Sequence, residues 1–447
     1  MSKTVLSNSG VVRLRHVEYK FFRRMTKAHN DQTRRVKKAD PRYRPVICQC
    51  VCLLCILFAT LLADAARNPK VRSRAGEGAA SQNGPSAANV NHAIDLAVGY
   101  MNRACDPNGR FAYRIDIASG QLIPSYNIVR HAGAVYALAM ANGSHPDQRT
   151  SDTILRAARF MRLNYIGPGV RPEQLTVWSK PLAQHSDAEL GATALGLVAL
   201  AEARKLDPKS VSLEQLQALG RFVLFSQRPD GSFVQKYNAD KKPMAKWSSP
   251  YYPGEAALGF IALYAADHSR VWLAAAAKSL SYLATKRSGI SAAPNDHWAL
   301  IATARLLPYC RKSECGTSYH ALVRHAIQIC KAILREQLES SSEASDGAFD
   351  AAGRTAPTAT RMEGLLATLE FLPDEYGGLR REIQAAIGRG IAFLIRAQIA
   401  SGPAAGGLPG ALASGVPGAS EVRIDYLQHT LCAWLRYELL IHNSVQS

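Results

Sequence analysis

The chain has 447 residues, of which 47% are hydrophobic and 20% charged, and its formal net charge is +19. This composition excludes an intrinsically disordered chain and allows either two or three average domains or one large domain built from repeats. A positive charge suits nucleic acid, anionic lipid or an acidic polymer. Because the sequence has no zinc-finger spacing, RNA-binding aromatic motif or phosphate-binding loop, we expect no nucleic-acid partner.

The N-terminal region predicts export. Residues 1–45 hold 13 Lys/Arg against 3 Asp/Glu, and residues 46–63 are 18 positions without a charge. That is about the shortest run that spans a membrane, and the positive flank is expected to stay inside. We therefore predict a basic cytoplasmic segment over 1–45 and a signal-anchor helix over 46–66 in the inner membrane, with the main domain in the periplasm. The alternative is a signal peptide cleaved near Ala63-Asp64-Ala65, which would secrete the domain to the periplasm.

A flexible linker and then a repeat follow this region. Residues 67–88 are rich in Gly, Ser, Ala and Arg without an apolar period, as is typical of a linker. In an exported domain, Cys310 and Cys315 are spaced to close a small disulfide loop. From 89 to 445, amphipathic helical segments alternate with segments richer in Ala, Gly and Leu that are apolar on most faces. These second segments begin near residues 126, 187, 252, 295, 358 and 423.

The junctions between the segments share a pattern. In "SLEQLQALGRFVLFSQRPDGSF", Ser212 and Gln215 have capping-box spacing, and the helix then gives way to Gln227, a turn at Asp230-Gly231 and Phe233. A glycine in such a step permits the positive backbone angle of a tight turn. Six helix pairs at this spacing predict a ring, in which apolar inner helices are surrounded by amphipathic outer ones. Related turns occur at Asn108-Gly109, Asp346-Gly347 and Gly406-Gly407.

The Gln-x-x-x-Gly-x-Phe ending resembles the repeat of terpenoid cyclases and protein prenyltransferases. The six helix pairs are similar to the (α/α)6 toroid shared with many glycoside hydrolases, polysaccharide lyases and sugar epimerases. The resemblance covers about residues 88–445 and implies an all-α toroid of six outer/inner helix pairs with little strand. It does not fix the chemistry. A terpenoid cyclase is disfavoured because the Asp-x-Asp-Asp acid motif and an Asp/Cys/His zinc set in the right register are absent.

Polar side chains recur in the first turns of the six predicted inner helices. If these helices run parallel, the first turns meet at one mouth of the ring, where free backbone N–H groups also favour anions. Alignment of the six segments puts one titratable residue of each in a single column: His131, Glu189, Glu255, His297, Glu363 and His429. The other residues expected to bind substrate at the mouth are Tyr126, Asn127, Arg130, Tyr252, Asp296, Trp298, Arg361 and Asp425.

Aromatic rings beside carboxylates, histidines and arginines suit a sugar polymer. We expect a glycan-processing enzyme that acts on an extracytoplasmic, acidic polysaccharide or oligosaccharide without a cofactor or metal. A hydrolase would use two carboxylates, whereas a lyase or epimerase would abstract a proton with His or Tyr. His131 and His297 fall on opposite sides of the predicted mouth, similar to the paired histidines of toroid sugar epimerases. The catalytic candidates are Glu255, His131, Glu189 and His297.

Two non-catalytic functions fit the same residues. The mouth can bind glycan as a partner of a membrane polysaccharide synthesis or export machine. Alternatively, the protein is a scaffold in which the first-turn charges only cap helices. The sequence leaves the choice among hydrolase, lyase, epimerase and binding protein open.

Overall fold

The computed structural model describes residues 84–184, 186–310, 317–339 and 345–446. The predicted cytoplasmic segment, the signal-anchor helix and Cys315 lie outside these residues, so those predictions stay predictions. Within the described ranges, no helix has both the length and the apolar character needed to cross a membrane.

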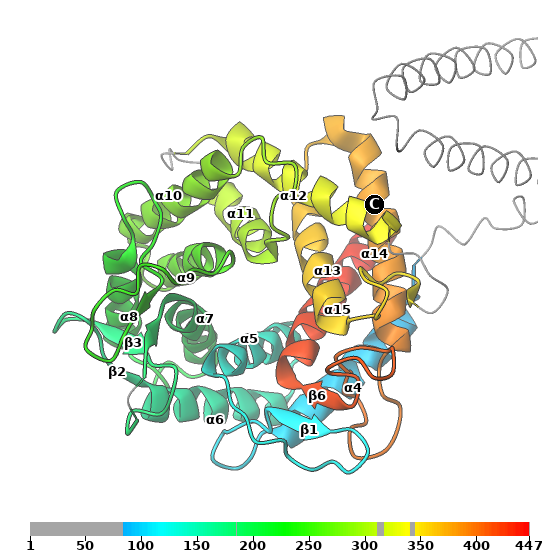
Figure 1. The fold of residues 1–447 in the computed structure, drawn as a ribbon, viewed down its shortest axis with the longest axis horizontal. Helices are drawn as coiled ribbons and strands as arrows, with labels where there is room; N and C mark the ends of the chain where they lie inside the picture. The colour runs from blue at the N-terminus through cyan, green and yellow to red at the C-terminus, as the bar shows by residue number, and fades with distance from the viewer. Residues whose placement is uncertain (1–83, 185, 311–316, 340–344, 447) are drawn as a thin grey trace, which may run out of the picture. The chain divides into compact units, whose positions relative to one another are not determined.

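Two concentric rings of helices form the described domain (Figure 1). The outer helices are α4 (Ala87–Ala104), α6 (Gln148–Tyr165), α8 (Leu213–Ser226), α10 (Arg270–Lys286), α12 (Tyr319–Glu339) and α14 (Gly377–Arg396). The inner helices are α5 (Ile128–Ser144), α7 (Leu190–Leu206), α9 (Tyr252–Asp267), α11 (His297–Cys310), α13 (Thr355–Leu369) and α15 (Ile424–Gln446). Each inner helix starts within three residues of its predicted start.

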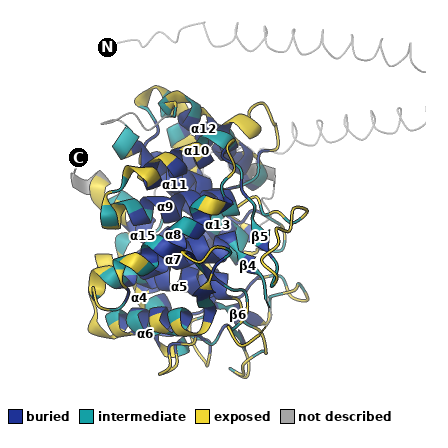
Figure 2. Ribbon diagram, turned by 90° about the vertical axis from the view of Figure 1, so that its left-hand side faces the viewer, coloured by how far each residue is buried: buried dark blue, intermediate teal, exposed yellow. Residues whose placement is uncertain are grey.

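The inner ring is closed. Every inner helix packs on the next one around the ring, and α15 packs on α5 to complete the circle. Helix α7 is buried on almost all sides, whereas α6 buries one stripe that includes Ile154, Ala157 and Met161. The inner helices are therefore mostly dark in Figure 2, and the outer helices show exposed faces. This arrangement confirms the predicted toroid of six outer/inner pairs.

The repeated glycine turns have a packing reason. Gly109, Gly231, Gly347 and Gly406 all have positive φ, between 86° and 91°. A Cβ built on each would lie 2.1 to 2.5 Å from a backbone carbonyl oxygen of the next outer helix. Only glycine therefore satisfies both the backbone angle and the close approach. The turn of each repeat fixes its distance to the following outer helix.

The glutamine of the repeat links neighbouring outer helices by hydrogen bonds. Gln227 Nε2 donates to the carbonyl oxygen of Ala275 on α10, 2.9 Å away. Gln398 does the same to Ala93 on α4, at 3.0 Å, and so links the last turn to the first helix. Gln337 binds Ala386 on α14 in the same way. The predicted capping box of Ser212 and Gln215 is also present.

Three short antiparallel strand pairs and one 3₁₀ turn, η3 (Asp374–Tyr376), complete the described structure. Strands β4 and β6 lead directly into α7 and α15, so they lie at the end of the ring where the inner helices begin (Figure 2). Strand pairing joins the start of the domain to its end, with Ile115 opposite Val422. The pairs are β1 (Arg114–Asp116) with β6 (Glu421–Arg423), β2 (Ile166–Pro168) with β3 (Leu175–Val177), and β4 (Ala188–Glu189) with β5 (Lys236–Tyr237).

Candidate functional site

A cavity of about 500 Å³ opens at the N-terminal ends of the inner helices. Its wall comes from the starts of α5, α9, α11, α13 and α15, together with the loops that precede them. The volume is in the usual range for a small-molecule site. Eight of the residues predicted from sequence line it: Asn127, Arg130, Tyr252, Glu255, His297, Trp298, Asp425 and His429.

The cavity has an aromatic wall and a cationic wall. The aromatic wall lies on the α9 and α11 side, where the rings of Trp247 and Tyr252 are 5.1 Å apart between centroids. Tyr251 and Trp298 extend this wall. Pro253 lies in the first turn of α9, where its missing N–H costs no hydrogen bond, and so supports the turn that presents the tyrosines. The cationic wall consists of Arg130, Arg354 and Arg423.

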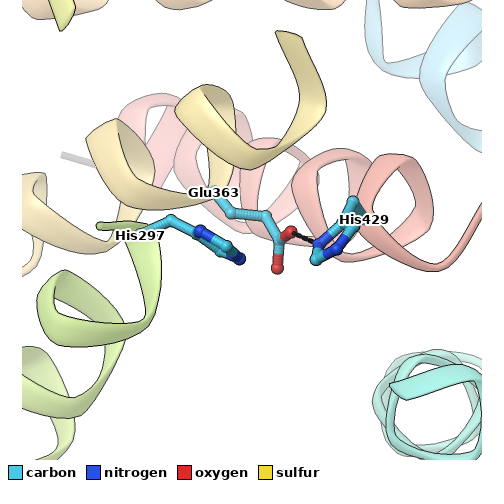
Figure 3. Close-up of side chains that lie close together, drawn as sticks. All are labelled: His297, Glu363 and His429. Carbon is cyan, nitrogen blue, oxygen red and sulfur yellow. Dashed lines mark hydrogen bonds and ion pairs between the residues drawn. The ribbon is translucent and has the colours of Figure 1, made fainter. Parts of the chain in front are cut away.

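Two buried histidines that line the cavity meet a buried glutamate that does not line it (Figure 3). His297 comes from α11, Glu363 from α13 and His429 from α15, and the Glu363 carboxylate lies between the two rings. Glu363 Oε1 is 2.6 Å from His429 Nδ1. The ring centroids of His297 and His429 are 5.1 Å apart, with the rings nearly perpendicular. Three helices far apart in sequence thus build one cluster.

His297 is the unsatisfied member of this cluster. Only 4% of the residue is exposed, and neither ring nitrogen has a hydrogen-bond partner among the described residues. Burial, followed by repulsion from His429, lowers the pKa of His297 well below 6.5. The ring is therefore neutral near pH 7 and can accept a proton. A buried polar group without a partner is costly, so its retention suggests a ligand in the functional state.

Glu363 orients its neighbour. Burial raises the pKa of Glu363, and the hydrogen bond and charge of His429 oppose that rise. The bond to Nδ1 fixes the orientation of the His429 ring and the tautomer it can hold. The donor atoms of His297, Glu363 and His429 all lie within 4.8 Å of one another, so these residue types could also hold a single metal ion such as Zn²⁺.

Glu255 is the second buried acid in the cavity wall. It is 3% exposed, and its Oε2 has no partner among the described residues. Burial raises its pKa to about 8 despite the opposing charge of Arg130, so it is mostly protonated at neutral pH. A Cβ on Gly191 of α7 would lie 2.3 Å from that oxygen. The glycine therefore makes room for the Glu255 side chain.

Asp425 differs from Glu255 in its partners. Arg423 donates to both of its carboxylate oxygens, at 3.0 and 2.7 Å, and Arg130 Nε lies 3.5 Å from Oδ2. Burial alone would raise the pKa of Asp425, but the two arginines outweigh burial and hold it below its ordinary value. The cavity thus contains one protonated and one ionised carboxyl group.

His131 lies away from the cavity. It is fully buried between α5 and α6, where Nδ1 is 2.8 Å from the hydroxyl of Tyr126 and Nε2 is 2.9 Å from the carbonyl oxygen of Ala157. Phe111 and Phe160 pack against its ring. Burial lowers its pKa to about 4. The structure therefore pairs His297 with His429, rather than with His131 as the sequence suggested.

The remaining predicted residues have protein partners and do not line the cavity. Glu189 binds Lys236 at 3.1 Å and accepts a hydrogen bond from the hydroxyl of Tyr252. Asp296 caps α11 through the N–H of Ala299 and forms a buried ion pair with Arg287. Arg361 binds Glu336 on α12. These contacts are those of helix-capping and packing residues.

Several lining residues were not singled out by sequence analysis. Arg354 is one, although an arginine at a helix N-cap, where Ser or Asp is typical, was an available signal. Gly410 and Pro417 belong to a loop without periodicity that folds back over α13. In that loop the carbonyl oxygen of Gly410 accepts the N–H of Thr355. The position of this loop depends on tertiary contacts, which the local sequence pattern does not report. The other lining residues of this kind are Val129, Ser249, Ala356, Pro357, Thr360 and Tyr426.

Comparisons with known proteins support the fold. No family model matches the sequence, and no curated protein is similar to it. Among solved structures, the chain is similar to a cellobiose 2-epimerase from Spirochaeta thermophila, at 12% identity and TM-score 0.58, over 81% of this chain and 97% of that one. It is also similar to a family 76 α-mannanase from Bacteroides thetaiotaomicron, at 10% identity and TM-score 0.54, over 79% of this chain and 97% of that one. A polysaccharide lyase is similar at 13% identity and TM-score 0.52, over 80% of this chain and 99% of that one. At these identities the likeness concerns the toroid fold alone.

Proposed function

We propose that this protein is a carbohydrate-active enzyme that moves a proton at the carbon next to a sugar carbonyl, as an epimerase or isomerase does. The observation that carries the proposal is the buried pair of His297 and His429, which line the aromatic-walled cavity and are linked through Glu363. Epimerisation needs a base on one face of the sugar carbon and an acid on the other. The site offers two imidazoles, 5.1 Å apart and nearly perpendicular, of which one can act as the base and the other as the acid.

In the proposed reaction, each of these side chains has one role. Neutral His297 takes the proton from C2 of an open-chain sugar, and the electron pair of that C–H bond moves into an enediolate. Protonated Glu255 donates a hydrogen bond to an oxygen on which negative charge develops. His429, oriented by Glu363, then gives a proton to the opposite face of C2. One C–H bond is broken and another is formed, so the product is an epimer of the substrate.

The fold comparisons agree with this reaction class without selecting it. The similar structures include proteins described as sugar epimerases and a mannose isomerase, besides hydrolases and a lyase. We further propose that the domain acts outside the cytoplasm on a reducing sugar end of an oligosaccharide or polysaccharide. The basic N-terminus and the uncharged stretch 46–63 support that location.

A hydrolase is the second candidate, because the cavity holds two carboxyl groups in opposite states. Glu255, with its raised pKa, has the character of a general acid, and ionised Asp425 has that of a base or nucleophile. Against it, Arg423 and Arg130 engage the carboxylate oxygens of Asp425. His297, in contrast, has no competing partner.

The test is solvent exchange. The protein is incubated in D₂O with cellobiose, mannose, glucose and their uronic acids, and loss of the C2 proton signal is followed by NMR. We expect exchange that His297→Asn and His429→Asn each abolish, while His92→Asn, an exposed matched variant, retains it. Glycosidic cleavage that depends on Glu255 but not on His297 would instead support the hydrolase. Loss of exchange after chelation, with recovery on adding Zn²⁺, would show metal chemistry at the cluster of His297, Glu363 and His429.

A further inference from the structure

The charges around the cavity are unequal. Three guanidinium groups line it, those of Arg130, Arg354 and Arg423. Two carboxylates offset them, because Asp425 binds Arg423 and Asp350 binds Arg354. Asp425 is committed to Arg423 through two short hydrogen bonds. Arg130 shares this carboxylate at a longer distance, so two arginines face one carboxylate there.

Arg130 is also the arginine with the most uncommitted donors. Its guanidinium contact is a 3.5 Å approach of Nε to Asp425, which is beyond good hydrogen-bond length. Its side chain is 36% exposed. Arg423, by comparison, donates twice to Asp425 and lies over the ring of Tyr426. The Nη groups of Arg130 are therefore free to form a two-pronged contact with a ligand.

The buried acid of the cavity wall adds no carboxylate to this balance. Glu255 is buried and mostly protonated at neutral pH. On the cationic wall, the three arginines thus outnumber the two carboxylates paired with them by one.

We propose that the sugar that this site accepts is a uronic acid, with its carboxylate bound by Arg130 and its ring against the aromatic wall of Trp247 and Tyr252. The inference rests on the proposed function, because it names the substrate class of the same cavity. A carboxylate is planar and carries a single negative charge, which matches one guanidinium fork and one unpaired charge. A phosphate monoester carries nearly two charges at neutral pH and is less well matched here.

The experiment measures binding and turnover separately. Isothermal titration calorimetry compares glucuronate, galacturonate and mannuronate with glucose, galactose and mannose, and with glucose 6-phosphate. Exchange of the C2 proton in D₂O is followed for the same sugars. Arg130→Gln keeps a polar amide that can donate a hydrogen bond, but it shortens the side chain and removes the charge. Arg335→Gln, whose side chain binds the Ser291 carbonyl on the outer surface, is the matched control.

We expect at least one uronate to bind about 10- to 100-fold more tightly than its neutral hexose, as a charged hydrogen-bonded pair would provide. Arg130→Gln should reduce that ratio to within about threefold of unity, and Arg335→Gln should leave it unchanged. Equal affinity for uronates and hexoses, a ratio insensitive to Arg130→Gln, or tighter binding of the sugar phosphate would each overturn the inference. Uronate preference without C2 exchange would refute the proposed reaction and leave the uronate site standing.

Discussion

Two histidines near the start of inner helices show how differently two sides of this ring are built. His131 on α5 is enclosed by aromatic rings, and both of its nitrogens are bonded to protein atoms. His297 on α11 is equally buried, yet neither nitrogen is bonded within the described residues, and its ring faces His429. On the α5–α6 side of the ring, the buried histidine has all its hydrogen-bond partners within the protein, and we call this side the completed core. On the α11–α13–α15 side, the buried histidine has ring nitrogens available to a ligand, and we call this side the open core.

The difference comes from the neighbouring elements. The turn at Gly109 brings Phe111 over His131, and Tyr126 adds a hydroxyl at hydrogen-bond distance. At His297 the ring of Tyr251 packs on the imidazole, and α13 and α15 present Glu363 and His429, but none of the described residues bonds to either of its nitrogens. A polar residue in a first turn is therefore only a candidate until its surroundings are known.

The largest effect expected from this comparison concerns the two histidines themselves. His297→Asn should lower turnover by about 10²- to 10⁴-fold with little change in melting temperature, because it removes the proposed base but no hydrogen bond. His131→Asn should keep activity at low temperature but lose about 2–4 kcal/mol of stability, since two buried hydrogen bonds are broken. Steady-state rates and urea unfolding of both variants check this. The reverse pattern would show that the catalytic side has been misassigned.

Glu363→Gln is expected to have the next largest effect. Glutamine keeps the shape but cannot hold the charge that stabilises a protonated His429, so we expect turnover to fall by about 100-fold. The KM should change by less than threefold, because Glu363 does not line the cavity. Glu189→Gln is the matched control on the other side of the ring, where the carboxylate binds Lys236. Equal loss of turnover in both variants would contradict the assignment.

Much of the fold could be predicted from the sequence, because helix periodicity and the Gly turns report local geometry. The inner-helix starts and the capping box of Ser212 and Gln215 are of this kind. The residues of the candidate site were harder to predict from the sequence. His429 and Glu363 were named in the right turn, but whether a first-turn side chain points to the ring axis or to the outer layer depends on helix rotation. That rotation is set by packing such as the close approach of Gly133 to Gln428.

Glu255 and Glu189 extend the comparison to carboxylates. Glu255 has a pKa raised to about 8, against 4.5 when unfolded, so its neutral form contributes stability below pH 4.5 that is lost as the pH rises toward 8. Glu255→Gln should therefore gain stability at pH 8 relative to the unmodified protein, by at most about 4 kcal/mol, and gain little at pH 5. Glu189→Gln should lose stability, because it breaks the contacts with Lys236 and Tyr252. Unfolding at the two pH values measures both, and a Glu255→Gln curve parallel to the unmodified one would show that Glu255 is ionised in the fold.

The smallest expected effect is the acid sensitivity of the completed core. His131 has a pKa of about 4 in the folded protein and 6.5 when unfolded, because burial disfavours its charged form. Below pH 6.5 the unfolded chain binds a proton at this histidine, whereas the folded chain does not. The free energy of unfolding therefore falls as the pH drops toward 4, by on the order of 3 kcal/mol.

His131→Asn cannot take up that proton. The stability difference between this variant and the unmodified protein should therefore be largest at pH 7 and shrink toward pH 4.5 in urea unfolding. Exposed His92→Asn should show no such trend. A difference that stays constant with pH would mean that acid opens the α5–α6 core to water before His131 is protonated. The contrast between a completed core and an open one would then not hold for these two histidines.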